Sequence, residues 1–351
     1  MSQTESRIEV FLLALPQTAG SALYGMVDVL AATGTLWREF VGEEAGRQLI
    51  LPRIVSTTKR PFRCGNNIPI SPELTLDEAT NPYIVIVPEL WLAPTEDLKN
   101  QYAEVKNWLR HCYGQGSIIY SACSGVVLLA AAGLLNGRAA TSHWGYEDLF
   151  RKSFPEVKFN PAPNLVVSDH TGRIVTAGGT TSWHDLAIHI ISRHLSPGEA
   201  LRIAKVYLLK WHGEGQLPYA SLVRRQPYAD AVVRRAEKWL GKHFRELHAV
   251  SAVVEHCEVP ERSLKRRFKA ATGSTLIGQV QNLRIEEAKR LLESETISVD
   301  EIGVRVGYEN QAFFRRLFKR STGLTPGAYR RMFQPLAKLE QLHHAALGNV
   351  R

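Results

Sequence analysis

A cysteine flanked by small residues lies near the middle of the chain, in the segment Ser121-Ala-Cys123-Ser-Gly125. The apolar run over residues 116–122 predicts a buried strand that passes directly into a helix over residues 124–132. Such an elbow would place the Cys123 sulfur at a helix N-terminus, where N–H groups and the helix dipole favour a thiolate and bind anions. His143, twenty positions further on, could act as a base. Cys123 is therefore either a nucleophile or a small side chain that lines a ligand pocket.

A second candidate surface is a basic segment that occurs twice in the C-terminal third. Residues 260–273 align without a gap on residues 310–323, and the alignment pairs Phe268 with Phe318. In the second copy, apolar residues recur at helical spacing on one face, and basic and polar residues occupy the opposite face. Repetition of such a unit indicates one structural device used twice.

Short helices precede both copies. Ser298-Val-Asp-Glu301 forms a capping box that starts a helix through Val306, and Gly307 ends this helix by tolerating a left-handed turn. Residues 249–257 supply the equivalent helix before the first copy. The pattern of helix, tight turn and helix predicts two helix-turn-helix units, which a helix over residues 275–294 would hold at a fixed separation.

The excess positive charge is confined to the part of the chain that carries the repeat. Residues 224–351 contain 24 Lys and Arg against 14 Asp and Glu, a net charge of +10, whereas residues 1–223 contain 19 against 20, a net charge of −1. Binding to a phosphate backbone requires such a surface, and a small-molecule enzyme does not. A solvated basic surface is the alternative, but the basic residues lie on the free faces of paired helices, which favours nucleic acid.

Strand and helix signals alternate along the first two thirds. The predicted strands are residues 8–15, 49–57, 83–87 and 116–122 with a hairpin over 164–168 and 174–176, and the predicted helices are residues 23–36, 95–113, 124–132 and 182–195. This alternation predicts an α/β domain with a mainly parallel sheet covered by helices on both faces, followed by an all-α domain. The expected divisions are a first domain over 1–212, a linker over 213–229, a second domain over 230–333 and a tail over 334–351.

The second domain resembles the DNA-binding domains of the AraC/XylS family. The closing pattern of that family is matched by Gly307-Tyr308, Phe314, Arg316, Phe318-Lys319, Gly323, Thr325-Pro326 and Tyr329-Arg330. The resemblance implies that the second helix of each unit enters a major groove, with the two grooves about one turn of DNA apart. By position, the implied base-facing residues are Glu261, Arg262, Lys265 and Arg266 in the first unit and Gln311, Ala312, Arg315 and Arg316 in the second. Arg suits guanine, Gln suits adenine and Ala suits a thymine methyl, whereas Lys265 suits a phosphate.

The first domain resembles the ThiJ/PfpI superfamily, the class I amidotransferase-like proteins, whose fold is a flavodoxin-like doubly wound sheet. The resemblance covers residues 8–195 and rests on the Cys123 elbow and on the segments 132–135, 140–144 and 176–182. Joined to an AraC-type second domain, it is similar to the GlxA family of transcriptional regulators.

Departures from the enzymes of that superfamily bear on Cys123. Those enzymes usually carry a Glu after the first strand, where Ala22 stands here, and the peptidase-like members place His directly after Cys, where Ser124 stands. The loop Pro88-Glu-Leu-Trp91 offers bulk where an oxyanion would need bare backbone N–H groups. The resemblance therefore implies a sensory pocket rather than a catalytic one, with an orienting carboxylate expected to be absent.

The same fold brings the loops that carry three tryptophans to one edge of the sheet. Aromatic faces hold ammonium groups by cation–π attraction, although each tryptophan could equally be an ordinary packing residue. Similar regulators respond to nitrogenous metabolites such as amino acids and betaines, which implies a small zwitterion as effector. The predicted ligand-binding residues are Cys123, Ser124, His143, Trp91, Trp144 and Trp183.

The sequence therefore predicts a regulator that binds double-stranded promoter DNA and a small-molecule effector, acting as a homodimer and usually as an activator. RNA polymerase is a further candidate partner, and the alternative is a Cys-dependent hydrolase or amidase tethered to DNA. The cysteines and histidines show no metal-ligand spacing, so we expect neither a metal nor a cofactor. With no apolar run of spanning length and no signal peptide, a reducing cytoplasm is the expected location.

Overall fold

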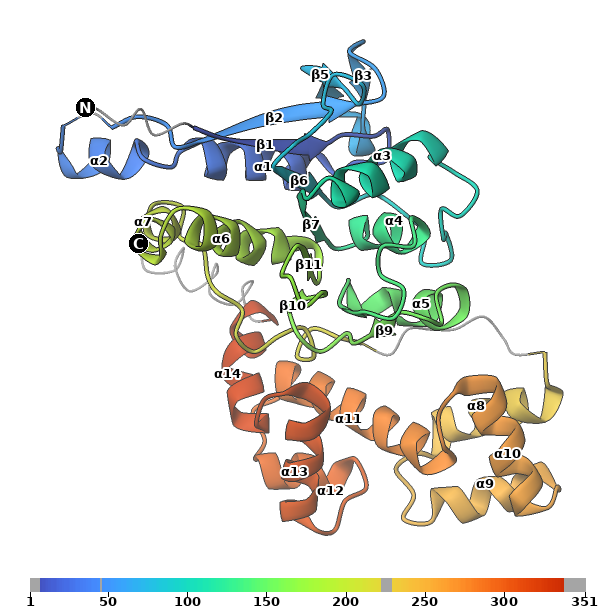
Figure 1. Ribbon diagram of the computed structural model, residues 1–351. Helices are drawn as coiled ribbons and strands as arrows, with labels where there is room; N and C mark the ends of the chain where they lie inside the picture. Colours follow the sequence, from blue (N-terminus) through green and yellow to red (C-terminus); the bar gives the residue numbers. More distant parts are fainter. Residues whose placement is uncertain (1–6, 45, 222–228, 338–351) are drawn as a thin grey trace. The chain divides into compact units, whose positions relative to one another are not determined.

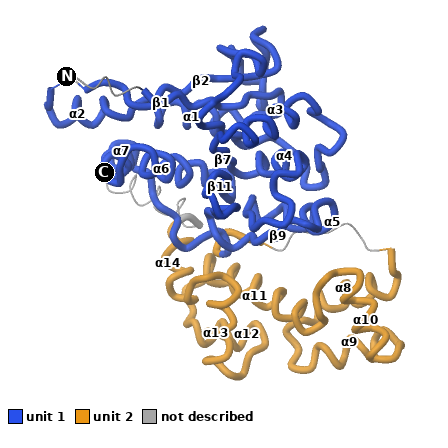
Figure 2. Tube along the Cα trace, in the orientation of Figure 1, with its two compact units in different colours: residues 1–217 blue, residues 218–351 orange. Residues whose placement is uncertain are grey.

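The chain folds into two compact units in the computed structural model, which describes residues 7–44, 46–221 and 229–337. Unit 1 comprises Met1–Leu217 and unit 2 comprises Pro218–Arg351 (Figures 1 and 2). Unit 1 mixes strands and helices, whereas the described residues of unit 2 form helices and their connections alone.

Unit 1 is built on a seven-stranded sheet in the order β10-β11-β7-β6-β1-β2-β5. Neighbouring strands are parallel, except that β10 and β11 form the predicted antiparallel hairpin. The strands are β1 (Ile8–Leu13), β2 (Ile50–Ser56), β5 (Leu74–Thr75), β6 (Ile84–Val87), β7 (Ile118–Ala122), β10 (Leu165–Val167) and β11 (Ile174–Ala177). Two small additional sheets pair β3 (Phe62–Arg63) with β4 (Pro69–Ile70) and β8 (Ala139–Ala140) with β9 (Lys158–Phe159). The predicted doubly wound sheet is confirmed.

Successive apolar residues of the central strands point to opposite faces of this sheet and build a core on each. In β6, Val85 and Val87 pack with α3, α4 and α5, whereas Ile84 and Ile86 pack with α1, α6 and α7. The helices of unit 1 are α1 (Gly20–Ala31), α2 (Leu36–Val41), α3 (Ala103–Gly114), α4 (Gly125–Ala131), α5 (Glu147–Ser153), α6 (Trp183–His194) and α7 (Pro197–Val206). Because the sheet is covered on both faces, its strands are continuous apolar runs.

Two predicted helices differ from the observed ones at their ends. The helix expected over residues 23–36 stops at Ala31, because the chain turns at Gly34, where φ is +80°. The helix expected over residues 95–113 begins only at Ala103. Leu98 and Tyr102 before it have φ of +56° and +54°, which a right-handed helix excludes.

Unit 2 contains two three-helix groups that share one long helix. The helices are α8 (Ala231–His243), α9 (Ala249–Cys257), α10 (Glu261–Thr272), α11 (Leu276–Ser294), α12 (Val299–Arg305), α13 (Gln311–Thr322) and α14 (Pro326–Ala337). The start of α11 joins a core with α8, α9 and α10, and the rest of α11 joins a second core with α12, α13 and α14. Both predicted helix-turn-helix units are present.

The sequence repeat is also a structural repeat, and the two copies share equivalent hydrogen bonds. At the end of α10, Thr272 Oγ1 donates to Phe268 O at 2.8 Å, and at the end of α13, Thr322 Oγ1 donates to Phe318 O at 2.9 Å. The next residue is a glycine in both copies, with φ of +75° and +76°. The left-handed glycine ends each helix. The predicted N-cap of α12 is confirmed as well, because Ser298 Oγ accepts from Glu301 N at 3.1 Å.

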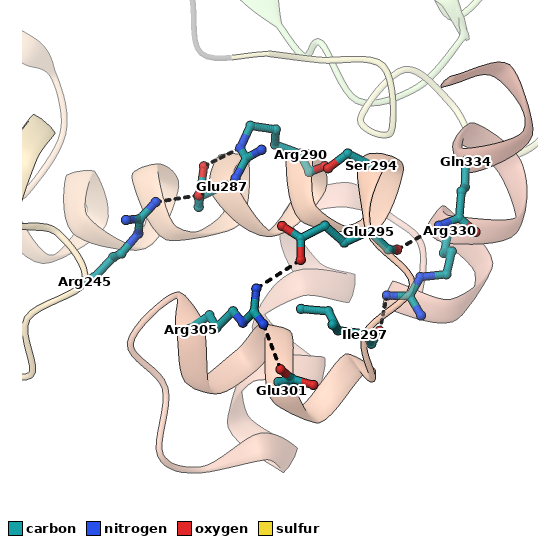
Figure 3. Close-up of polar contacts among 10 residues, drawn as sticks. All are labelled: Arg245, Glu287, Arg290, Ser294, Glu295, Ile297, Glu301, Arg305, Arg330 and Gln334. Carbon is teal, nitrogen blue, oxygen red and sulfur yellow. Dashed lines mark hydrogen bonds and ion pairs between the residues drawn. The ribbon is translucent and has the colours of Figure 1, made fainter. Parts of the chain in front are cut away.

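Polar contacts fix the second group of helices around the end of α11 (Figure 3). Arg305 of α12 contacts Glu295 at 3.0 Å and Glu301 at 2.9 Å. From α14, Arg330 donates to Ile297 O and Gln334 donates to Glu295 O, each at 2.7 Å. These bonds satisfy backbone carbonyls that follow the last turn of α11.

Candidate ligand site and DNA-contacting helices

Cys123 lies in a strained turn between β7 and α4. Its φ is +53°, in the left-handed region that residues other than glycine rarely adopt, and its side chain is buried. Its N–H donates to Ala177 O of β11 at 3.1 Å, and its carbonyl accepts from Ser142 Oγ at 2.6 Å. These bonds from the neighbouring strand and loop hold the turn in place.

The carboxylate expected to be missing beside Cys123 is supplied by Glu89. The Cys123 thiol donates to Glu89 Oε1 at 3.4 Å, and Thr180 Oγ1 donates to the same oxygen at 3.1 Å. Glu89 Oε2 is buried and has no hydrogen-bond partner among the described residues. Glu89 follows the buried strand β6, which neighbours β7 in the sheet. The carboxyl ends of adjacent parallel strands meet at one edge.

Burial and this pairing determine the protonation of the site. Burial raises the pKa of the Glu89 carboxyl, since few groups nearby stabilise its charge. Burial, reinforced by the adjacent Glu89, raises the pKa of the Cys123 thiol as well. The raised pKa of the thiol opposes a thiolate at the helix N-terminus. α4 spans only seven residues, and its dipole is outweighed by desolvation and by the nearby acid.

His143 is placed as a hydrogen-bond donor rather than as a base for Cys123. Its Nδ1 accepts from Gly145 N at 3.0 Å, which puts the proton of the neutral ring on Nε2. Burial lowers the pKa of His143 and keeps the ring neutral. Within the described part of unit 1, Cys123 Sγ bonds to Glu89 and Thr180, and no hydrogen bond joins it to His143.

Ser124, predicted as a ligand-binding residue, has a structural role. It is fully buried, and its hydroxyl both accepts from Leu90 N at 2.9 Å and donates to Leu90 O. Burial and these two bonds give Ser124 a structural role, and its direct contact with a ligand stays a prediction. The bonds instead hold the loop that carries Glu89 against the start of α4.

The three predicted tryptophans each pack on a different partner. The Trp144 ring lies on His143, with ring centroids 4.8 Å apart. Trp183 covers Gly25 of α1, where an added Cβ would lie 2.5 Å from the indole, and Trp91 covers Gly65 in the same way at 2.4 Å. Among residues 7–44 and 46–221, the structure records no ring contact between any two of these tryptophans. Among the ring contacts recorded for residues 7–44 and 46–221, the Trp144–His143 contact is the one that joins two predicted ligand-binding residues.

The last residues of unit 1 are hydrogen-bonded to the loops of this site. Gln216 is buried, although it belongs to the segment expected as a linker, and its Nε2 donates to Ser142 O at 3.0 Å and Thr141 Oγ1 at 3.1 Å. His212 contacts Asp185 of α6 through its backbone N–H at 2.8 Å and its ring Nδ1 at 2.9 Å. Sequence patterns did not indicate these contacts, because a glutamine in a Gly-rich segment carries no signal of burial.

Glu89→Gln is predicted to change how the stability of unit 1 depends on pH. A carboxyl whose pKa is raised on folding stabilises the folded state below the pKa of the unfolded chain and loses that contribution as the pH rises through the folded pKa. Glutamine does not titrate, so the free energy of unfolding of the variant, relative to wild type, should increase as the pH rises from about 4. Urea unfolding of the full-length chain at several pH values measures this difference. Glu39→Gln on the exposed surface of α2 is the control, and a relative stability that falls with pH would contradict the prediction.

The candidate DNA-contacting residues lie on α10 and α13, and most of them are exposed (Figure 1). Arg266 and Arg316 occupy equivalent positions of the repeat, and the side chain of neither forms a hydrogen bond or ion pair within the described residues. Arg315 Nη2 lies 2.7 Å from Asp300 Oδ1 of α12, and Lys265 pairs with Glu261 on its own helix. Two further predicted residues, Arg262 and Ala312, are also exposed.

Gln311 is the exception among the predicted base-contacting residues. Its Nε2 donates to Tyr308 O at 3.1 Å, and its Oε1 is buried without a hydrogen-bond partner in residues 229–337 or elsewhere in the described chain. The side chain packs so closely on Gly303 of α12 that a Cβ there would lie 2.0 Å from Gln311 Oε1. The structure therefore corrects the expectation that Gln311 offers its amide to adenine. As the first residue of α13, it faces the preceding helix.

Comparisons with known proteins agree with this arrangement. The model of the DJ-1/PfpI family matches residues 32–193, and a helix-turn-helix domain model matches residues 253–332. The chain is similar to the HTH-type transcriptional regulator GlxA of Rhizobium meliloti, at 29% identity over 228 residues, covering 64% of this chain and 68% of that protein. It is similar to the regulator CdhR of Pseudomonas aeruginosa, at 24% over 274 residues (78% and 79%). The regulator GbdR of the same species aligns at 22% over 331 residues (92% and 86%).

The fold and these matches define a DNA-binding transcriptional regulator of the AraC type. Its DJ-1/PfpI domain joined to a double helix-turn-helix domain is the domain combination of the GlxA family, which confirms the resemblance predicted from the sequence. Within the described residues, no helix combines the length and apolar character needed to cross a membrane, and no group of three or more His, Cys, Asp or Glu could hold a metal ion.

Proposed function

We propose that this regulator responds to a small metabolite that unit 1 binds without converting it. The observation that carries the proposal is the neighbourhood of Cys123, whose thiol contacts the Glu89 carboxyl while His143 accepts from Gly145. A nucleophilic cysteine needs a base or a cation beside it to become a thiolate. Glu89 has the opposite effect, because a carboxylate disfavours a second negative charge nearby. This arrangement favours a binding site over a catalytic one.

Glu89 also indicates the chemistry of the effector. Its buried Oε2 lacks a donor within the part of the chain that the structure describes, and an ammonium group of a ligand would supply one together with a compensating charge. The Nε2–H of His143 would suit a carboxylate of the same ligand, and the Trp144 ring beside it offers an aromatic face to a cation. We therefore favour a small zwitterion, an amino acid or a betaine.

A chain of hydrogen bonds leads from this site to the end of unit 1. Ser142 Oγ donates to Cys123 O, and Ser142 O accepts from Gln216, one residue before the end of the unit. A ligand at Cys123 and Glu89 would alter these bonds and thereby the segment that leads into the DNA-binding unit. The proposal includes a homodimer in which each protomer binds one half-site, contact with RNA polymerase, and action in the cytoplasm where the DNA lies.

Calorimetry of the full-length chain with a panel of amino acids and betaines tests the proposal, together with promoter footprinting in the presence of each compound. We expect a compound that binds, is recovered unchanged and alters the footprint. Trp144→Ala should weaken its binding, with Trp37→Ala on α2 as the matched control. Gln216→Ala should keep the binding and lose the effect on the footprint. Equal binding by wild type and Trp144→Ala would remove Trp144 from the site.

The alternative function, a Cys-dependent hydrolase or amidase, is distinguished in the same experiment. If a compound were consumed by the wild-type chain and left intact by Cys123→Ala, the site would be catalytic. The strained φ of Cys123 is the observation that favours this alternative, since such turns present nucleophiles in enzymes. The raised pKa of its thiol opposes it.

A further inference from the structure

Arg284 lies in the middle of α11, the helix that the two helix-turn-helix units share, and it is 8% exposed. A buried guanidinium is stable only when its N–H groups find acceptors. Nε donates to Phe244 O at 2.7 Å and Nη2 donates to Glu246 O at 2.7 Å. Both carbonyls belong to the connection between α8 and α9, called here the α8–α9 corner, in the first helix-turn-helix unit. Nη1 donates to Gly307 O at 2.8 Å, which belongs to the turn between α12 and α13 in the second unit.

The two helix-turn-helix units also touch directly beside Arg284. Gly307 has φ of +96°, and a Cβ there would lie 2.4 Å from Arg245 O and 2.9 Å from Arg284 Cζ. The turn between α12 and α13 therefore lies against the backbone of the α8–α9 corner, and the space at position 307 admits no side chain. Arg245 forms an ion pair with Glu287 of α11, which adds a further contact to the same corner (Figure 3).

From this contact, packed groups continue toward both DNA-contacting helices. The Arg284 guanidinium lies over the Tyr308 ring at 5.0 Å, and Tyr308 stacks on Phe314 of α13 at 5.6 Å. On the other side, Glu246 O also accepts from Ala249 N, the first residue of α9, at 3.2 Å. Cys257 of α9 and Leu264 of α10 lie in one buried core. The buried Arg284 side chain thus bonds both to the α8–α9 corner, which packs toward α10, and to the turn that precedes α13.

We propose that Arg284 is a positioning residue that sets the separation and angle between α10 and α13, and through them the operator spacing that the regulator accepts. The proposal rests on the placement of α10 and α13 in successive major grooves. Each base pair added between the two contacted segments moves them about 3.4 Å apart and turns them by about one tenth of a helical turn. A pair of helices held rigidly would reject such a shift, whereas a loosened pair would tolerate it.

The experiment uses the full-length chain with Arg284→Lys and Arg284→Ala, and with Arg290→Ala as the control. Arg290 lies on the same helix and is exposed, and within the described residues its guanidinium is hydrogen-bonded to Glu287 of that helix and to no carbonyl of the two corners (Figure 3). Lysine keeps the positive charge but cannot reach three carbonyls in different directions. An operator selected from random DNA by the wild-type chain is prepared in its original form and with one or two base pairs inserted or removed between the contacted segments.

We expect wild type and Arg290→Ala to lose about tenfold or more in affinity when one base pair is inserted, a change of about 1.4 kcal/mol. Arg284→Lys should bind the original operator about tenfold more weakly and differ by less than about threefold between the spacings. Hydrogen exchange checks that α10 and α13 remain folded in the variants. Should Arg284→Ala fail to fold, Arg284→Lys alone carries the comparison.

An unchanged preference for the original spacing in Arg284→Lys would overturn the proposal and leave Arg284 with a role in folding alone. A wild-type chain that binds every spacing equally would overturn two-helix recognition as well. The two failures are therefore distinguished by which protein lacks the preference.

Discussion

Arg316→Ala should weaken binding to the operator by about 5- to 150-fold, the loss expected for one bidentate contact between arginine and guanine. Arg316 is exposed on α13 and forms no hydrogen bond or ion pair within the described residues, so its guanidinium is available to a base. Arg315 beside it differs, because Asp300 of α12 already binds its Nη2 at 2.7 Å. Binding of Arg316→Ala to random DNA should fall much less, since only one phosphate-attracting charge is lost.

Titration of labelled operator and of random DNA at one fixed salt concentration measures both losses. Lys238→Ala is the matched control, because it removes an exposed basic side chain from α8, a helix outside the two recognition positions. Arg266→Ala removes the equivalent side chain in the first unit and should cause a loss of similar size. An equal loss of Arg316→Ala on operator and random DNA would mean that Arg316 contacts phosphate and only positions the protein.

The sequence predicted both helix-turn-helix units correctly because the same pattern of buried residues and terminal glycine occurs in each copy of the repeat. Buried residues such as Phe268 and Phe318 recur at equal places, and the glycines that end α10 and α13 have nearly the same φ. Periodicity assigns a residue to a face of its own helix, but it does not show which neighbouring helix covers the edge of that face. Gln311 lies at such an edge, and Gly303 of α12 leaves just enough room for its amide to turn inward.

In unit 1 the position of the Cys123 turn followed from a strand meeting a helix, but the neighbours of the sulfur did not. In enzymes of similar sequence the carboxylate lies on the loop after the first strand, where this chain has Ala22. Glu89 reaches the same sulfur from the loop after β6, because β6 and β7 are adjacent in the sheet. Strand order is a tertiary property, so a pairing that depends on it is visible only once the sheet has been built.

Phe318→Ala should destabilise the second helix-turn-helix unit by about 3–5 kcal/mol, the usual range for a buried phenylalanine in a packed core. Phe318 is fully buried, and its ring lies between Phe314 at 5.9 Å and Tyr329 of α14 at 5.5 Å. Removal of the ring leaves a cavity that joins α13, α14 and α11, and helices of twelve residues do not persist without their packing. Specific DNA binding should be lost with the unit.

Hydrogen exchange of the full-length chain measures the effect, because it reports the opening of each helix separately. Amide protection in α13 and α14 should fall by about 10²- to 4 × 10³-fold, at about 1.4 kcal/mol for each factor of ten. Phe268→Ala, the equivalent change in the first unit, should act on α8, α9 and α10 instead. The exposed Phe313→Ala is the control for loss of an aromatic side chain from α13. Equal loss of protection across all helices of unit 2 would contradict two separate cores, and would mean that α11 and the Arg284 contacts make the pair unfold as one.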